Sequence, residues 1–238
     1  MGLFFQETHN FLSQIDPGSV FVEIGSDRLE GSTLYFANLA KEHNTILHTV
    51  DITTEPQSRI CHDSIEWHIG VGSEWCKDVW PMVNKKISLL YLDNFDYDWD
   101  TSDNPQSLMP KIWNKIHYDA IKGEDWPAKF TEFKLLPSWI QQEVLELHGM
   151  SLELINTDIE DIYTRNNLIL NNNNCQIEHF KQIHYLFPYL SDKCLIVFDD
   201  TYLANECWIG KNGPGVIFLQ ANGFNIIKKN PRAVMLAR

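Results

Sequence analysis

The chain has 238 residues, of which 44% are hydrophobic and 12% aromatic, and it carries 32 acidic against 19 basic side chains. This composition is that of one globular domain with room for an insertion, and it excludes a disordered chain. The formal charge of −13 disfavours a nucleic-acid partner, because Lys and Arg neutralise phosphates, and favours a neutral or cationic small molecule.

We expect no targeting signal in this sequence. No apolar run approaches the roughly 20 residues of a membrane span, and Met1–Glu7 lacks the basic start and the cleavage site of a signal peptide. The five cysteines are scattered without a C-x-x-C pair, which disfavours a disulfide framework and a zinc knuckle. We therefore expect a cytoplasmic protein without a membrane partner, and a homo-oligomer is compatible with the sequence.

A βαβ pattern follows a short helix predicted within the first nineteen residues. The apolar run Val20–Ile24 predicts a buried strand, and it stops at Gly25. A helical pattern over Leu34–Glu42 leads to a second apolar run, Ile46–Val50, which ends on Asp51. Such a unit can hold an adenosine, because the glycine admits the ligand and the terminal carboxylate accepts hydrogen bonds from the ribose hydroxyls.

The loop between Gly25 and Gly31 discriminates between adenosine-containing cofactors. A dinucleotide fold needs G-x-G-x-x-G, whose middle glycine makes room for a pyrophosphate. Here that position is Asp27, and Glu30 adds a second negative charge beside the later glycine. An acidic loop suits the sulfonium and ammonium groups of S-adenosylmethionine (SAM) better than the phosphates of NAD.

Several short motifs resemble class I SAM-dependent methyltransferases, in particular the small-molecule O-methyltransferase branch with its catechol and macrolide-sugar enzymes. The motifs are Glu23-Ile24-Gly25-Ser26, Glu30-Gly31-Ser32-Thr33, Val50-Asp51, Tyr91-Leu92-Asp93 and Val197-Phe198-Asp199-Asp200, and the likeness covers roughly residues 18–98 and 174–238. The resemblance implies a Rossmann-like three-layer α/β sandwich, with a mostly parallel seven-stranded sheet, an antiparallel C-terminal hairpin and SAM as cofactor.

The βαβ motif, the loop after the third strand and the resemblance together predict the cofactor contacts. They are Glu23, Gly25, Ser26, Gly31, Ser32, Thr33, Asp51, Gly72, Ser73 and Asp93.

The hydrophobic pattern of the remaining sequence predicts three more strands, two more helices and a C-terminal hairpin. We expect the strands at 65–71, 87–92 and 194–198, the helices at 74–84 and 177–187, and the hairpin between 224–228 and 233–237. Gly213-Pro214-Gly215 is expected to form a turn.

An insertion interrupts this rhythm after the fourth strand. Residues 99–173 contain four tryptophans and four prolines and no clear parallel strand, and the tract Asn171–Asn174 predicts a turn or loop. Residues 1–98 and 174–238 then form the SAM-binding core. Because both ends of the insertion join the edge of the sheet where ligands bind, we expect a lid or an acceptor-binding subdomain.

Three carboxylates, those of Asp93, Asp199 and Asp200, follow two strands that should be neighbours in the sheet. They would repel one another unless a cation joins them, and oxygen ligands suit Mg²⁺ or another divalent cation. The catechol-type enzymes hold a metal on matching acids, where it orients the acceptor and lowers the pKa of its hydroxyl. The alternatives are solvated strand ends or a carboxylate that contacts the cofactor.

The identity of the general base is open, because the sequence departs from the catechol-type pattern. Those enzymes place a lysine three residues after the first metal aspartate, and here that residue is Asp96. Asp96 and Asp199 are the carboxylate candidates for catalysis. His148 and His179 are weaker candidates, since a single histidine on a helix is more often structural.

The function implied is SAM-dependent methyl transfer to a small molecule, at a hydroxyl oxygen and with the help of a divalent metal. A metal-independent N- or O-methyltransferase is the first alternative. An NAD-dependent oxidoreductase and a catalytically silent cofactor-binding subunit are more distant ones.

Overall fold

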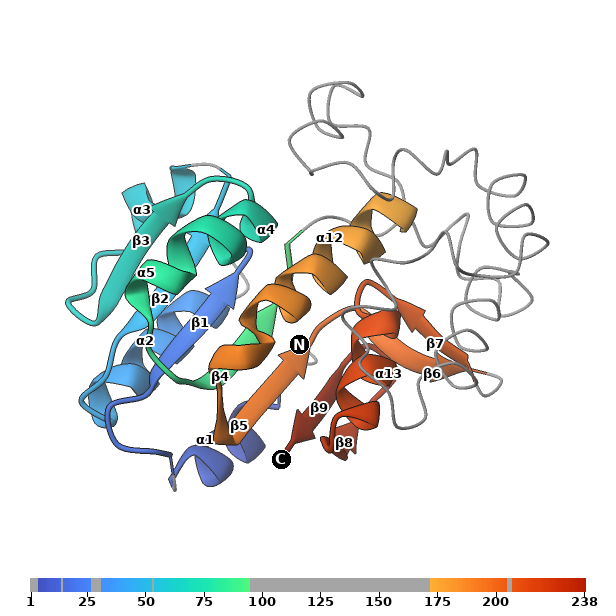
Figure 1. The fold of residues 1–238 in the computed structure, drawn as a ribbon. Helices are drawn as coiled ribbons and strands as arrows, with labels where there is room; N and C mark the ends of the chain where they lie inside the picture. The colour runs from blue at the N-terminus through green and yellow to red at the C-terminus, as the bar shows by residue number, and fades with distance from the viewer. Residues whose placement is uncertain (1–3, 14, 27–30, 53, 95–171, 205–206) are drawn as a thin grey trace.

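A seven-stranded mixed sheet forms the centre of the protein (Figure 1). The computed structural model describes residues 4–13, 15–26, 31–52, 54–94, 172–204 and 207–238. Most of the predicted insertion, together with Asp96 and His148, lies outside the described residues. The strands of the sheet are β1 (Val20–Ile24), β2 (Leu47–Asp51), β3 (Ile65–Ile69), β4 (Ile87–Leu92), β5 (Leu190–Phe198), β8 (Asn225–Lys229) and β9 (Val234–Ala237).

The strand order is β3-β2-β1-β4-β5-β9-β8. Strands β1 to β5 run parallel, whereas β9 is antiparallel to both β5 and β8. The predicted α/β class, with a mostly parallel seven-stranded sheet and antiparallel C-terminal strands, is confirmed. Because the chain runs from β1 to β2 on one side and returns to β4 on the other, the carboxyl ends of β1 and β4 flank the topological switch point, where open α/β sheets bind ligands.

Nine helical segments and one small hairpin accompany the sheet in the described residues. The helical segments are α1 (Phe5–Leu12), α2 (Ser32–Glu42), α3 (Glu55–Arg59), α4 (Gly72–Glu74), η1 (Trp75–Val79), α5 (Trp80–Val83), α12 (Asn172–Leu186), η3 (Phe187–Tyr189) and α13 (Gly213–Ala221). The hairpin consists of β6 (Thr201–Ala204) and β7 (Cys207–Gly210). Within the described part of the chain, no helix combines the length and apolar character needed to cross a bilayer.

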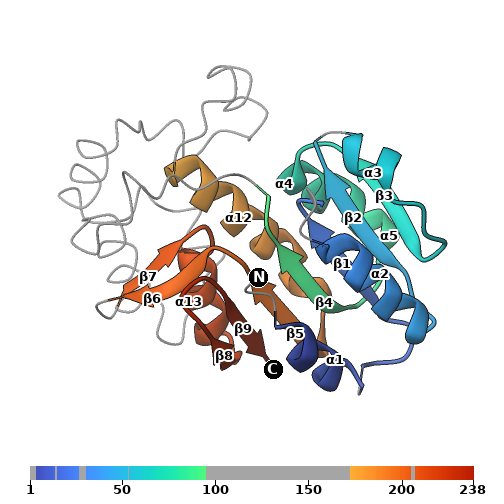
Figure 2. The same ribbon diagram turned by 180° about the vertical axis from the view of Figure 1, so that it is seen from behind.

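Side chains of β1 alternate between two apolar clusters, as the pleat of a strand requires. Val22 and Ile24 belong to a cluster with Phe180 of α12 and with residues of α13. Phe21 belongs to the other cluster, together with Phe36 of α2 and residues of α1. In Figure 1, α12 and α13 lie in front of one face of the sheet. In Figure 2, which is turned by 180°, α1 and α2 lie in front of the opposite face.

The helix predicted at 74–84 is observed as the continuous run α4, η1 and α5. Its middle part, Trp75–Val79, has π geometry and lies just before Pro81. Proline has no N–H for the usual α-helical hydrogen bond, which is consistent with the change of geometry at this point.

Two turn predictions are wrong. Asn172 begins helix α12, because the helix that packs its apolar residues on the sheet extends upstream through the asparagine tract. Gly213-Pro214-Gly215 forms the first turn of α13, where proline is well tolerated. A Cβ on Gly215 would lie 2.2 Å from Ile183 Cδ1, so this glycine permits the close contact between α13 and α12.

Candidate functional site

The ends of β1, β2 and β4 converge at the glycine turn after β1. Gly25 has a φ of 91°, and a Cβ there would lie 2.4 Å from the backbone nitrogen of Asn94. The next residue, Ser26, donates its N–H to Asp51 Oδ2 over 3.0 Å. The glycine is therefore required by the close approach of the chain after β4, and the same turn holds the carboxylate at the end of β2.

Behind this turn, Glu23 is fully buried on the face of β1 that α2 covers. Its two carboxylate oxygens accept hydrogen bonds from the hydroxyls of Ser32 (2.8 Å), Thr33 (2.7 Å) and Thr49 (2.7 Å). The Thr49 hydroxyl has one hydrogen, which it donates to Glu23. In the 2.8 Å hydrogen bond between Ser26 and Thr49, the Ser26 hydroxyl is therefore the donor. This network fixes the start of α2 against β1 and β2.

Four predicted cofactor residues, Glu23, Ser26, Ser32 and Thr33, thus lie in one buried network beside the turn. Gly31 precedes α2 in the left-handed conformation, with a φ of 92°. Their arrangement shapes the backbone at the predicted binding edge. A direct contact between any of them and a cofactor stays a prediction.

The predicted residues Gly72 and Ser73 pack against α12. A Cβ on Gly72 would lie 2.5 Å from Ile24 Cγ2 and 2.7 Å from Gln182 Nε2. Ser73 donates its N–H to Glu178 Oε1 over 2.8 Å, and Gln182 Nε2 donates to the same oxygen over 2.7 Å. Burial of Glu178 raises the pKa of its carboxyl group.

Buried polar atoms near this contact have unused hydrogen-bonding capacity. Asn94 Oδ1, Glu178 Oε2, His179 Nε2 and Gln182 Oε1 have no hydrogen-bond partner among the described residues. Such atoms usually meet a ligand, a water molecule or another part of the chain. Sequence reasoning missed Glu178 and Gln182, although two polar residues four positions apart on an otherwise apolar helical face were a usable signal.

Two of the three predicted metal-binding aspartates, Asp93 and Asp200, pair with a lysine that sequence reasoning missed. Lys211, which is 3% exposed, donates to Asp93 Oδ1 over 2.7 Å and lies 3.2 Å from Asp200 Oδ2. Arg232 donates to the other oxygen of Asp200 over 2.9 Å. Lys211 follows β7, so its position depends on the β6–β7 hairpin, which the sequence pattern did not reveal.

The charges at this edge alter one another's protonation. Burial opposes the charged form of Lys211, but Asp93 and other nearby acidic groups outweigh it and raise the pKa of the lysine. Burial, and then the negative charge of Asp93, raise the pKa of Asp199 to about 6. Lys211 is therefore a fixed cation, and the raised pKa of Asp199 suits this carboxyl group to accept a proton near neutral pH.

The weaker base candidate His179 is buried on α12. Its Nδ1 lies 2.7 Å from the carbonyl oxygen of Cys175, so Nδ1 carries the proton. Burial, followed by the charge of Lys211, lowers the pKa of His179 to about 3. The imidazole is neutral at physiological pH and is a weak base.

A different group of side chains has the composition of a metal site. Among the described residues, the ligand atoms of His48, Glu66 and His68 lie within 4.8 Å of one another. The three aspartates do not form such a group in the described structure, where Lys211 lies between Asp93 and Asp200. His48 pairs with Glu66 on the adjacent strand, and His68 lies two residues after Glu66. In the sequence, the alternation Glu66-x-His68 within a predicted strand was the signal for this cluster.

Comparisons with known proteins leave the family of this chain open. The chain matches no protein-family model, and no curated protein is significantly similar to it. Membership of the methyltransferase family is therefore a proposal that rests on the short motifs.

Proposed function

We propose that this chain is a class I SAM-dependent methyltransferase that acts on a small-molecule acceptor. The observation that best supports the proposal is the contact of Ser26 with Asp51, 3.0 Å, directly after the left-handed Gly25. It joins the glycine turn after β1 to the acidic end of β2, which is the arrangement needed beside a ribose. The antiparallel β9 between β5 and β8 agrees with the topology that the resemblance implies.

In this proposal the chain folds as a Rossmann-like three-layer sandwich with an insertion at 99–173 that covers the acceptor. SAM would lie across the carboxyl ends of β1, β2 and β4, with Asp51 at the ribose. Methyl transfer is an in-line displacement, so the main work of the protein is to align the two reactants. Asp199, whose pKa is raised to about 6, is the proposed proton acceptor.

Two versions of the chemistry differ in the role of a metal. In one, Asp93, Asp199 and Asp200 would hold Mg²⁺, whose positive charge would lower the pKa of an acceptor hydroxyl. In the other, no metal takes part and Lys211 supplies the positive charge beside Asp93. The distances of 2.7 and 3.2 Å from Lys211 to Asp93 and Asp200 favour the second version, because the ammonium already compensates these carboxylates.

Binding of S-adenosylhomocysteine tests the cofactor proposal directly. Asp51→Asn keeps an oxygen that can accept the Ser26 N–H but replaces the second oxygen by a hydrogen-bond donor. We expect calorimetry to show a loss of about 1.5–3 kcal/mol, or roughly 10- to 150-fold in Kd. Asp63→Asn, at an exposed carboxylate, is the control and should bind as the wild type does.

NAD is the competing ligand in the same experiment. It should not bind, and binding of NAD without binding of S-adenosylhomocysteine would make the chain an oxidoreductase candidate instead. Tight binding of S-adenosylhomocysteine without methyl transfer to any acceptor tested would favour a catalytically silent subunit. Full activity in a chelator would remove the metal from the mechanism.

A further inference from the structure

Strands β2 and β3 place two imidazoles and a carboxylate on the same face of the sheet. His48 of β2 pairs with Glu66 of β3, and Val50 pairs with His68. Residues that pair across parallel strands point to the same face, and so do residues two apart in one strand. His48, Glu66 and His68 therefore form one group within the face, before the carboxyl ends of the strands.

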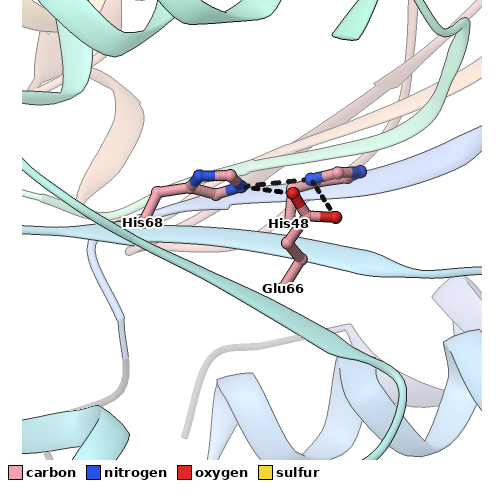
Figure 3. A group of neighbouring side chains, drawn as sticks. All are labelled: His48, Glu66 and His68. Carbon is pink, nitrogen blue, oxygen red and sulfur yellow. Dashed lines mark hydrogen bonds and ion pairs between the residues drawn. The ribbon is translucent and has the colours of Figure 1, made fainter.

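The donor atoms of this group have the spacing of metal ligands. His48 Nδ1 lies 3.2 Å from His68 Nε2, and each of these nitrogens lies 3.7 Å from an oxygen of Glu66. Ligands at 2.0–2.1 Å from a tetrahedral Zn²⁺ are about 3.3 Å apart. Figure 3 shows the nitrogens of the two rings facing each other, with the Glu66 carboxylate beside them.

Aromatic side chains support both imidazoles. His48 is buried, and its ring packs edge-on against Trp80 at a centroid distance of 5.3 Å. His68 packs on Trp75 at 4.9 Å, and the two tryptophans contact each other at 5.2 Å. This packing restricts the ring orientations, which a preorganised metal site requires.

Access to the group is from its carboxylate side. Glu66 lies on β3, which is the edge strand of the sheet, and its side chain is 55% exposed. The carboxylate can therefore swing toward an arriving ion, while the two imidazoles stay in place.

We propose that His48, Glu66 and His68 bind one divalent transition-metal ion of the zinc type, with a fourth position open to water. Two imidazoles and one carboxylate favour Zn²⁺, Co²⁺, Ni²⁺ or Cu²⁺ over Mg²⁺ and Ca²⁺, which prefer oxygen ligands. The ion replaces the contact between the two imidazoles, so both facing nitrogens bind as unprotonated ligands. It joins the edge strand β3 to β2 and does not depend on the proposed methyl transfer.

Cobalt titration of the full-length, chelator-treated protein tests this site. We expect one equivalent of Co²⁺ to bind, with visible absorption bands of a four-coordinate ion, and Zn²⁺ to displace it. His68→Ala and Glu66→Gln should each weaken binding by at least about tenfold, since changes merely around metal ligands already cost that much. A Zn²⁺-dependent rise in Tm should disappear in both variants.

Two control variants separate this site from other metal-binding groups. His9→Ala removes an exposed imidazole that also faces a glutamate, 3.6 Å from Glu42, and should leave Co²⁺ affinity unchanged. Asp199→Asn should also leave it unchanged, because that residue belongs to the carboxyl-end edge. Circular dichroism of the metal-free variants checks that they are folded. Absence of stoichiometric Co²⁺ binding, or equal binding by folded wild type, His68→Ala and Glu66→Gln, would overturn the proposal.

Discussion

Lys211 and Asp93 form a hydrogen-bonded ion pair of 2.7 Å between residues that are 118 positions apart in the chain. The pair connects the segment after β7 to the end of β4, and Asp200 lies 3.2 Å from the same ammonium group. The lysine side chain is almost completely buried. Among the described residues, Lys211 is therefore the cation that pairs with Asp93, and it shares Asp200 with Arg232.

Replacing Lys211 by methionine should destabilise the protein strongly. Lys211→Met keeps an unbranched side chain but leaves Asp93 and Asp200 without the cation between them. Breaking a buried ion pair from one side typically costs about 3–5 kcal/mol. Urea unfolding measures this change in the free energy of unfolding.

The partner of the pair supplies the control for this measurement. In Asp93→Asn/Lys211→Met, the loss should be smaller than the sum of the two single losses, because the unpaired carboxylate is absent. Additive losses would show that the two side chains do not stabilise each other. Mg²⁺ or Ca²⁺ should stabilise Lys211→Met more than the wild type, since the variant removes the ammonium group that pairs with Asp93 and with one oxygen of Asp200.

Asp199 should reduce stability at neutral pH. Its pKa in the folded protein is about 6, above the ordinary value of 3.8, so the folded state holds the proton more tightly than the unfolded state. Ionisation of Asp199 therefore lowers the free energy of unfolding. This loss of stability is absent below about pH 3.8, grows as the pH rises, and is complete above about pH 6, where Asp199 is ionised in both the folded and the unfolded state.

Asp199→Asn should therefore stabilise the protein at pH 7.5, by up to about 3 kcal/mol from the difference in pKa. Asparagine keeps an oxygen for the N–H of Asp200, which the aspartate now accepts over 3.0 Å. The gain should vanish near pH 4, as measured by urea unfolding at both pH values. A gain that is the same at pH 4 and pH 7.5 would contradict the raised pKa.

Alanine at Gly25 and alanine at Gly31 should have unequal effects on stability. Gly25 and Gly31 have nearly the same φ, 91° and 92°, so both alanines carry a similar backbone strain of roughly 1–2 kcal/mol. Around Gly31 no atom of the described residues lies within 4 Å of an added Cβ, whereas at Gly25 the Asn94 backbone nitrogen would lie at 2.4 Å. Gly25→Ala should thus lower the free energy of unfolding by about 4 kcal/mol or more. Equal losses would exclude the close approach as the reason for Gly25.

Glu23→Gln should weaken the attachment of α2 to the sheet. Three hydroxyls donate to the buried carboxylate, and glutamine replaces one accepting oxygen by a donor. A loss of about 1–3 kcal/mol is expected, because a buried hydroxyl loses its acceptor. Glu42→Gln, at an exposed carboxylate of the same helix, should change stability by less than about 0.5 kcal/mol. If both variants lose the same amount, the network is not stabilising.

Much of the sheet could be predicted because its signals are local. The expected strands 20–24 and 87–92 coincide with β1 and β4, whose residues are buried throughout, so their apolar runs mark both ends. The closing hairpin was also predicted, from two short runs around Asn230-Pro231. The β6–β7 hairpin, which forms a two-stranded sheet of its own, was missed because its sequence pattern is weak.

The features of the candidate site also divide into those that local sequence patterns predict and those that they do not. The sequence by itself determined the glycine turn after Ile24, the carboxylates at the ends of β2, β4 and β5, and the acidic surplus, because each follows from a residue type and its immediate neighbours. Only the tertiary structure decided that Lys211 compensates Asp93, that Glu178 receives the N–H of Ser73, and that His48 meets His68. These contacts join residues 20 to 118 positions apart, so they depend on strand register and helix packing, which no local pattern specifies.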